Sequence, residues 1–167
     1  LRINTAVCYG HLYLRPLLRA FCQRYPDIQL ELQINDLHVD IIEQNIDIAL
    51  RTGYVKDSRL IARRLSPMDF LVCVSPHYLA AHGTPTCADD FQQHSWIGFR
   101  IKQTQQLQPI FLPDAQGGYQ PFTLTPRYIT DDGEAMAQLC ADGFGFAQLP
   151  HFLAKAGLER GELVSLY

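Results

Sequence analysis

The sequence predicts an α/β fold in which strands and helices alternate, and three observations lead to this prediction. The apolar spacing of the first fifty residues follows the order βαβαβ. Gly and Pro residues separate the apolar segments that follow. With 167 residues and 47% apolar composition, the chain can fill one hydrophobic core or two small α/β lobes.

The chain opens with a predicted strand and helix. Residues 2–7 form a short apolar strand, and apolar side chains then recur at helical spacing over about 12–25. Pro26 ends this helix, because the residue before a proline is pushed out of the α region.

The next segment predicts a strand, a helix and a strand. Apolar and polar residues alternate over 28–34, which indicates a strand with one polar face and therefore an edge or an interface. Asp36 is a candidate N-cap for a helix through Ile42, and residues 46–50 form an apolar strand.

The middle of the chain contains a well-marked short helix. Apolar runs at 60–65 and 70–74 come before it. Ser75 supplies a capping residue, the helix covers 76–82 with Pro in its first turn, and Gly83 stops it. Strands are predicted at 96–99 and 122–124, separated by a turn or surface loop at Gly117-Gly118.

The last third predicts two further helices around one strand. Asp131 followed by Glu134 resembles a capping box that opens a helix, and Gly143 closes it. Residues 144–149 form a strand that Pro150 ends, and a final helix follows.

The composition of the chain argues against several classes of function. A net charge of −3 and a pI near 6.0 leave no basic excess, so we expect no DNA binding by this chain alone. The five cysteines include no CxxC pair, which predicts reduced thiols in a cytoplasm. We find no signal peptide and no apolar run long enough for a membrane helix. The start at Leu1, inside a strand, suggests a piece of a longer protein.

Five stretches, taken in order, resemble the effector domain of LysR-type transcriptional regulators over essentially the whole chain. The C-terminal Gly161-Glu162-Leu163 fits the same pattern. The stretches are Leu1-Arg2-Ile3 into Cys8-Tyr9-Gly10, Phe21 with Tyr25-Pro26-Asp27, residues 47–53, residues 75–79 and residues 143–150.

The resemblance implies a two-lobed fold like the type 2 periplasmic binding proteins, with two crossing strands and an effector in the interlobe cleft. Lobe I would comprise residues 1–68 and 149–167, and lobe II residues 69–148. The implied function is cytoplasmic ligand sensing for transcription regulation, with no enzymatic activity and no cofactor. DNA binding would belong to an N-terminal winged helix-turn-helix outside this chain.

The resemblance also implies a homodimer of this domain, and a tetramer of the parent protein. We expect the helix of about 12–25 and the edge strand 28–34 to pair with their copies, because the outer face of that strand needs a neighbour or water.

Candidate effector-binding residues in the first half follow strand ends, where open α/β sheets place ligands. Cys8 and Tyr9 precede a helix whose first N–H groups favour an anion, although Cys is a weaker donor than the hydroxyl that is common in the family. Leu37 and His38 follow the second strand. Arg51 follows the third and could hold a carboxylate, or could instead pair with Asp36 or Asp47.

In the second half of the chain, the candidate effector-binding residues again lie at the ends of predicted strands and helices. Arg100 is a second possible anion anchor, with a solvated arginine as the alternative, and Thr130 precedes a helix. Gln148, Pro150 and Phe152 lie where the resemblance returns the chain to lobe I.

Other function classes receive less support. A secreted solute-binding protein would share the fold but should carry a signal peptide. An enzyme with Cys8 as nucleophile and His11 or His38 as base lacks an orienting partner for the base. His77 and His82 lack the i, i+4 spacing of HExxH, so we expect no metal.

Overall fold

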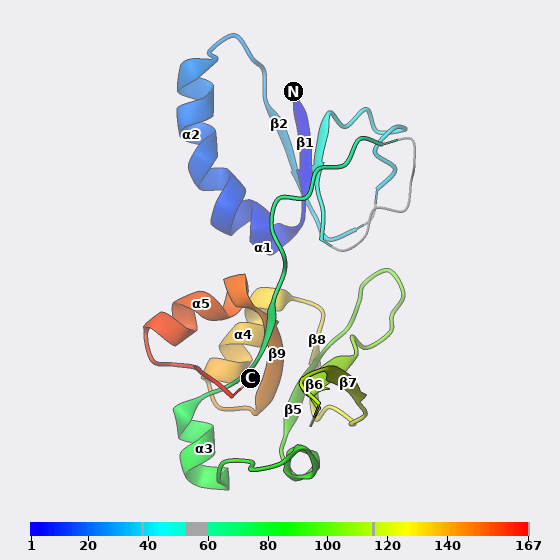
Figure 1. Ribbon diagram of the computed structural model, residues 1–167. Helices are drawn as coiled ribbons and strands as arrows, with labels where there is room; N and C mark the ends of the chain where they lie inside the picture. Colours follow the sequence, from blue (N-terminus) through cyan, green and yellow to red (C-terminus); the bar gives the residue numbers. More distant parts are fainter. Residues whose placement is uncertain (38, 53–59, 115, 167) are drawn as a thin grey trace. The chain divides into compact units, whose positions relative to one another are not determined.

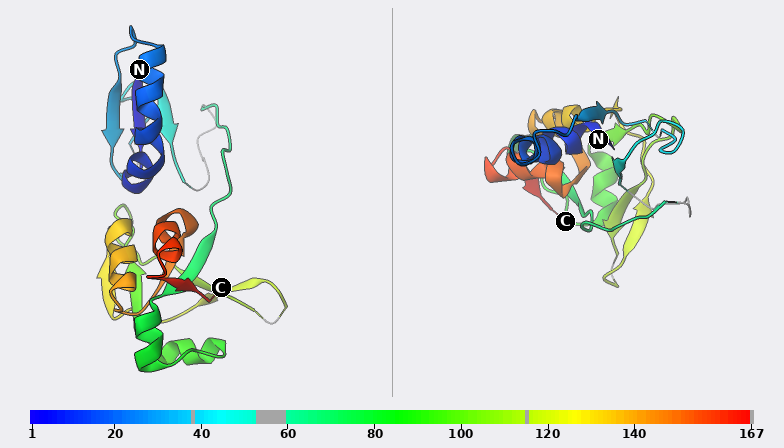
Figure 2. Two further views of the ribbon diagram at one scale, coloured as in Figure 1. Left: turned by 90° about the vertical axis from the view of Figure 1, so that its left-hand side faces the viewer. Right: turned by 90° about the horizontal axis from the view of Figure 1, so that it is seen from above.

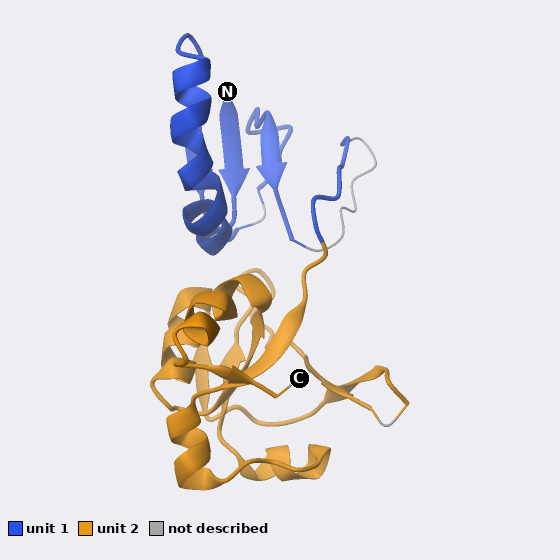
Figure 3. Ribbon diagram, turned by 60° about the vertical axis from the view of Figure 1, so that its left-hand side comes forward, with its two compact units in different colours: residues 1–66 blue, residues 67–167 orange. Residues whose placement is uncertain are grey.

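The structure, a computed structural model of the chain, describes residues 1–37, 39–52, 60–114 and 116–166. It divides into two compact units, Leu1–Ser66 and Pro67–Tyr167 (Figure 3). Residues 149–167, which the resemblance assigns to lobe I, lie within the second unit, because residues 146–150 form a strand that pairs with residues 70–74. The lobe boundaries implied by the resemblance stay a prediction.

Unit 1 contains a parallel three-stranded sheet. β1 (Arg2–Thr5) lies between β2 (Glu31–Ile34) and β3 (Ile48–Leu50), so β2 is an edge strand as predicted (Figure 1). Thr5 is paired with Ile34 on one side and with Leu50 on the other, which brings the carboxyl ends of the three strands together.

A single helical run follows β1 and covers one face of this sheet (Figure 2). It consists of α1 (Val7–Tyr9), a π-helical turn η1 (Gly10–Leu14) and α2 (Arg15–Arg24). A Cβ atom at Gly10 would lie 2.7 Å from the Thr5 side chain, so the helix approaches the sheet closely there. This helical run begins at Val7, five residues before the predicted start near residue 12.

The helix predicted from Asp36 through Ile42 is absent among the described residues of that segment, which instead form turns. Asp36 does accept a hydrogen bond at a helix start, but the donor is the Val7 N–H, at 2.9 Å. The turn is held by Asp40, whose carboxylate accepts from the backbone N–H groups of Ile42 and Glu43.

Unit 2 is built on a five-stranded sheet of order β10-β4-β9-β5-β8. β9 pairs antiparallel with β4 and parallel with β5, and β5 continues the parallel part to β8. The strands are β4 (Phe70–Val74), β5 (Trp96–Phe99), β8 (Tyr128–Thr130), β9 (Phe146–Pro150) and β10 (Val164–Ser165). β8, a strand of three residues, was not predicted from the sequence.

The helices of unit 2 are α3 (Pro76–His82), the 3₁₀ helix η2 (Ala88–Gln93), α4 (Gly133–Ala141) and α5 (His151–Glu159). The prediction for α3 is confirmed: Ser75 Oγ accepts from the Tyr78 N–H at 3.1 Å, and Gly83 ends the helix with φ +84°. The 3₁₀ helix η2 has no strong helical signal in the sequence, and it was not predicted.

A two-stranded hairpin completes unit 2. β6 (Ile110–Pro113) and β7 (Tyr119–Phe122) pair antiparallel, and Gly117 adopts φ +82° in the turn between them. The predicted turn is confirmed, but the second strand ends at Phe122 rather than covering 122–124.

The unit 2 core packs on both faces of its sheet. Trp96, Phe91 and Phe146 are nearly inaccessible and contact one another through their rings. A second cluster contains Cys73 and Cys140, and burial raises the pKa of the Cys73 thiol to about 12. All five cysteines are free thiols in the structure. Within the described residues, no helix has both the length and the apolar character to cross a membrane.

The cap of α4 differs by one residue from the prediction. Asp132, not Asp131, accepts from the Ala135 N–H, at 2.7 Å. We expect Asp132→Ala to lower the free energy of unfolding by about 1 kcal/mol, because an N–H of the first turn loses its partner. Asp131→Ala, which removes an exposed carboxylate 3.9 Å from Lys102, should change it by less than about 0.5 kcal/mol. Urea denaturation measures both, and equal losses would contradict the assignment.

Candidate functional site

The carboxyl end of the unit 1 sheet gathers several of the predicted residues. β1 leads into α1, which carries Cys8 and Tyr9, while β2 ends just before Asn35 and Asp36, and β3 ends just before Arg51. Cys8 is partly exposed, and Leu37 is 54% exposed. His38 lies outside the described residues. The structure thus brings the first-half candidates it describes to one sheet edge, where ligands bind in open α/β sheets.

The first helical turn at this edge is already in contact with a carboxylate. The Val7 N–H donates to Asp36 Oδ1 at 2.9 Å. An anion bound at α1 would therefore lie near the negative charge of Asp36, and a neighbouring cation would be needed to offset it.

Arg51 places a cationic side chain at this edge of the unit 1 sheet. Burial lowers the pKa of its guanidinium, and the charge of Asp36 acts in the opposite direction. Asp47, the other suggested partner, accepts instead from the Arg2 N–H at 2.7 Å. Of the two alternatives left open by the sequence, Asp36 is therefore the carboxylate that acts on Arg51.

Among the residues that the structure describes, three buried polar atoms on the unit 1 sheet have no hydrogen-bond partner. They are Oδ1 of Asn4, Oδ1 of Asn35 and Nη2 of Arg51. Buried polar groups are nearly always hydrogen-bonded, so three such atoms in one small unit need an explanation. Neither asparagine was predicted from the sequence to contact an effector, although Asn35 belongs to the loop that was expected at the binding cleft. The signal available was their alternation with apolar neighbours, which puts polar side chains on one face.

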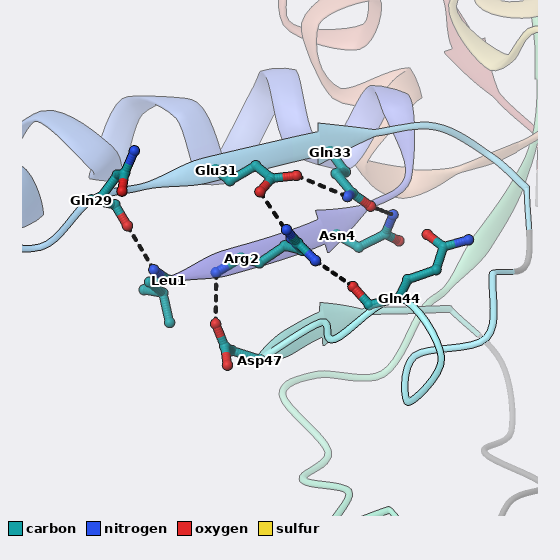
Figure 4. Close-up of polar contacts among 8 residues, drawn as sticks. All are labelled: Leu1, Arg2, Asn4, Gln29, Glu31, Gln33, Gln44 and Asp47. Carbon is teal, nitrogen blue, oxygen red and sulfur yellow. Dashed lines mark hydrogen bonds and ion pairs between the residues drawn. The ribbon is translucent and has the colours of Figure 1, made fainter.

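A polar network holds the opposite end of the same sheet (Figure 4). Arg2 Nε donates to Glu31 at 2.8 Å, and Arg2 Nη1 donates to the Gln44 carbonyl at 2.6 Å. Gln33 also donates to Glu31, and these contacts lower the pKa of the Glu31 carboxyl. The network joins β1 to β2 through side chains, and Arg2 also reaches the Gln44 carbonyl in the turn before β3, so its role is structural.

In unit 2, Arg100 and Thr130 lie together at the carboxyl ends of β5 and β8. The Arg100 N–H donates to the Thr130 carbonyl at 2.8 Å. The Arg100 guanidinium donates to the Gln105 carbonyl at 2.7 Å, and Thr130 Oγ1 accepts from the Asp132 N–H at 3.2 Å. Both side chains are therefore partly committed to their own loops.

Gln148 is committed to the hairpin. Its Oε1 accepts from the Phe111 N–H at 3.0 Å, and its Nε2 donates to the Phe111 carbonyl at 2.7 Å. Pro150 is both the last residue of β9 and the N-cap of α5, which carries Phe152. A shallow depression beside Gln148, lined also by Ile97 and Met136, encloses almost no space, so it is too small for a ligand site.

A family model described as the LysR substrate binding domain matches residues 1–166. The chain belongs to the LysR substrate-binding domain family. This family is that of the regulatory domains of LysR-type transcriptional regulators, and it confirms the mixed α/β, periplasmic-binding-protein-like fold that the sequence resemblance implied.

Relatives of this LysR domain are transcriptional regulators. The chain is 37% identical over 166 residues to CrgA of Neisseria meningitidis serogroup C, covering 99% of this chain and 54% of that protein. It is 26% identical over 163 residues to the activator AaeR of Escherichia coli, covering 98% and 52%. The chain thus spans about half the length of the curated relatives it matches.

Solved structures of regulatory domains are similar as well. The CrgA regulatory domain from Neisseria meningitidis has a TM-score of 0.84 and 36% identity, over 99% of this chain and 79% of that chain. The AphB regulatory domain of Vibrio vulnificus has a TM-score of 0.82 and 26% identity, over 99% and 81%.

Proposed function

We propose that this LysR substrate-binding domain senses a small organic acid through the carboxyl edge of the unit 1 sheet. The observation that carries the proposal is the buried Arg51 Nη2, which has no hydrogen-bond partner and lies in the strand-end region where ligands bind. A carboxylate could accept from it and would offset the buried positive charge. Cys8, Tyr9, Leu37 and His38 remain proposed contacts from unit 1.

The candidate contacts from unit 2 also remain proposals. They differ in how much hydrogen-bonding capacity their side chains have left for a ligand. Arg100 and Thr130 have hydrogen-bonding capacity beyond their loop contacts. Gln148 uses both ends of its amide on the hairpin, so Pro150 and Phe152 are better supported as apolar neighbours of a ligand than Gln148 is as a donor.

Arg51→Ala tests the proposed site. We expect acids that raise the melting temperature of the wild-type chain to bind at least tenfold more weakly, because a charge-assisted hydrogen bond is lost. Uncharged analogues should bind equally to both proteins. A thermal-shift screen of small carboxylates, aromatic acids and amino acids identifies the ligands, since a ligand that binds only the folded state raises stability.

The matched control is Arg63→Ala, which removes an exposed arginine from the same unit. Its affinity for acids should equal that of the wild type. If Arg51→Ala and Arg63→Ala reduce acid binding equally, a general charge effect explains the result and the proposed site is wrong.

The second part of the proposal is self-association through α2 and the edge strand β2. Leu17 on α2 is 67% exposed, and Ile28, just before β2, is 41% exposed. Apolar side chains beside an open strand edge favour pairing with a second copy. A homodimer of this domain, and a tetramer of the whole regulator, would follow.

Leu17→Glu tests this surface. We expect it to raise the dimer dissociation constant at least tenfold in sedimentation equilibrium, because a charge would be buried without a partner. Leu65→Glu is the control, since Leu65 is 66% exposed elsewhere in unit 1 and should leave the constant unchanged. A wild-type chain that stays monomeric at high concentration contradicts the proposal.

For the whole protein, we propose cytoplasmic transcription regulation, with DNA bound by a separate N-terminal domain and no catalysis by this one. The regulators among the relatives support this role over that of a secreted solute-binding protein. The net charge of −3 agrees with a domain that does not itself hold DNA.

A further inference from the structure

The three unpartnered atoms share one face of the unit 1 sheet. Asn4 is paired in register with Gln33 on β2 and with Ala49 on β3. Asn35 and Arg51 come two residues after these two partners, and side chains two apart in a strand lie on the same face. The Asn35 N–H donates to the Thr5 carbonyl at 3.0 Å, so the β-pairing continues to that position.

This face is opposite to the one that α1 and η1 cover. Gly10 packs against Thr5 and Ile34, which alternate with Asn4 and Asn35 along their strands. Asn4 is completely buried, and the one hydrogen bond that its amide makes is to Gln33, at 3.4 Å through Nδ2. Its Oδ1 atom therefore needs a donor from elsewhere.

The polarity of the three atoms limits what can satisfy them. Two are carbonyl-type oxygens, which only accept, and the third is a guanidinium nitrogen, which only donates. Neighbouring strands are about 4.8 Å apart, so the ends of β2 and β3, on either side of β1, are separated by roughly 10 Å. Because protein covers all three atoms in this structure, a ligand that bonds to Asn35 and Arg51 would require this edge of the sheet to open.

A plain carboxylate can satisfy only Arg51, because it has no hydrogen to donate to an asparagine oxygen. A carboxylate next to a hydroxyl or ammonium group supplies both an acceptor and a donor. We infer that the effector is a 2-hydroxy or 2-amino acid, whose carboxylate accepts from Arg51 Nη2 and whose neighbouring donor bonds Asn35 Oδ1. This inference rests on the proposed function, because it specifies the ligand of the same site.

The experiment compares pairs of acids that differ only in this donor. The probes are lactate against propionate, mandelate against phenylacetate, and phenylalanine against 3-phenylpropionate, titrated by calorimetry into the wild-type chain. We expect the acid with the donor to bind at least tenfold more tightly in the pairs that bind, since a buried acceptor left without a partner is costly.

Asn35→Leu keeps a side chain of similar size and removes the acceptor. It should reduce the preference within each pair to less than twofold, while Gln92→Leu, which changes an exposed amide in unit 2, should retain it. If Asn35→Leu lowers the melting temperature strongly, Asn35→Ala provides the same comparison.

The outcomes separate this inference from the proposed function. Equal binding within all pairs, still dependent on Arg51, overturns the inference alone and is what a buried water that serves the same three atoms would produce. A preference that persists in Asn35→Leu also overturns it. If no acid of either kind binds in an Arg51-dependent way, the proposed function fails and the inference fails with it.

Discussion

Gly145→Ala is expected to destabilise unit 2 by about 3 kcal/mol or more. Gly145 has φ +148°, and a Cβ atom there would lie 2.2 Å from the Ser95 carbonyl oxygen. That oxygen also accepts from the Phe146 N–H at 2.9 Å, so it cannot move away without breaking the start of β9. Urea denaturation followed by fluorescence of Trp96, the single tryptophan, measures the loss.

Gly83→Ala provides the matched control for this substitution. Gly83 has φ +84°, but nothing lies within 4 Å of the position of its Cβ atom. Alanine there should lose only the cost of adopting φ +84° with ψ 167°, about 1–3 kcal/mol and less than at Gly145. Similar losses for the two variants would mean that backbone conformation, rather than the contact with Ser95, explains the requirement for glycine at 145.

Cys8→Trp is expected to abolish the thermal stabilisation that acids produce while the domain stays folded. Cys8 is partly exposed on α1, the turn whose Val7 N–H is bound by Asp36. An indole at this position would crowd the carboxyl edge of the unit 1 sheet, where the proposed ligand binds. The thermal-shift screen before and after the substitution measures the effect.

Cys87→Trp introduces the same side chain at an exposed cysteine of unit 2, and it should leave the acid-induced shift intact. A ligand that binds Cys8→Trp with unchanged affinity would place the site away from α1 and would contradict the mapping.

Elements with strong local signals were predicted well from the sequence. The Ser75 cap and Gly83 stop of α3 act on their nearest neighbours, so a window of nine residues contains all the information. Asp36 illustrates the opposite case. It has the chemistry of a cap, but it caps α1, whose Val7 is 29 residues away, and no local window could reveal that partner.

The same distinction applies to the candidate site. Strand ends placed Cys8, Arg51, Arg100 and Thr130 near sheet edges, because the carboxyl ends of parallel strands follow from the order of elements. The commitment of Gln148 to Phe111, 37 residues away, depends on how a hairpin packs on a sheet. The pairing of β9 and β10 with β4 likewise joins segments that are far apart in the sequence.

The bonds between Gln148 and Phe111 also cover part of the open edge of the hairpin. A two-stranded hairpin exposes N–H and C=O groups along its outer edges, and such edges recruit strands from other molecules. The amide of Gln148 occupies both backbone groups of Phe111 on β6, as a neighbouring strand would. Pro121 on β7 has no N–H to offer. One side chain and one proline thus leave little for a foreign strand to pair with at the centre of this hairpin.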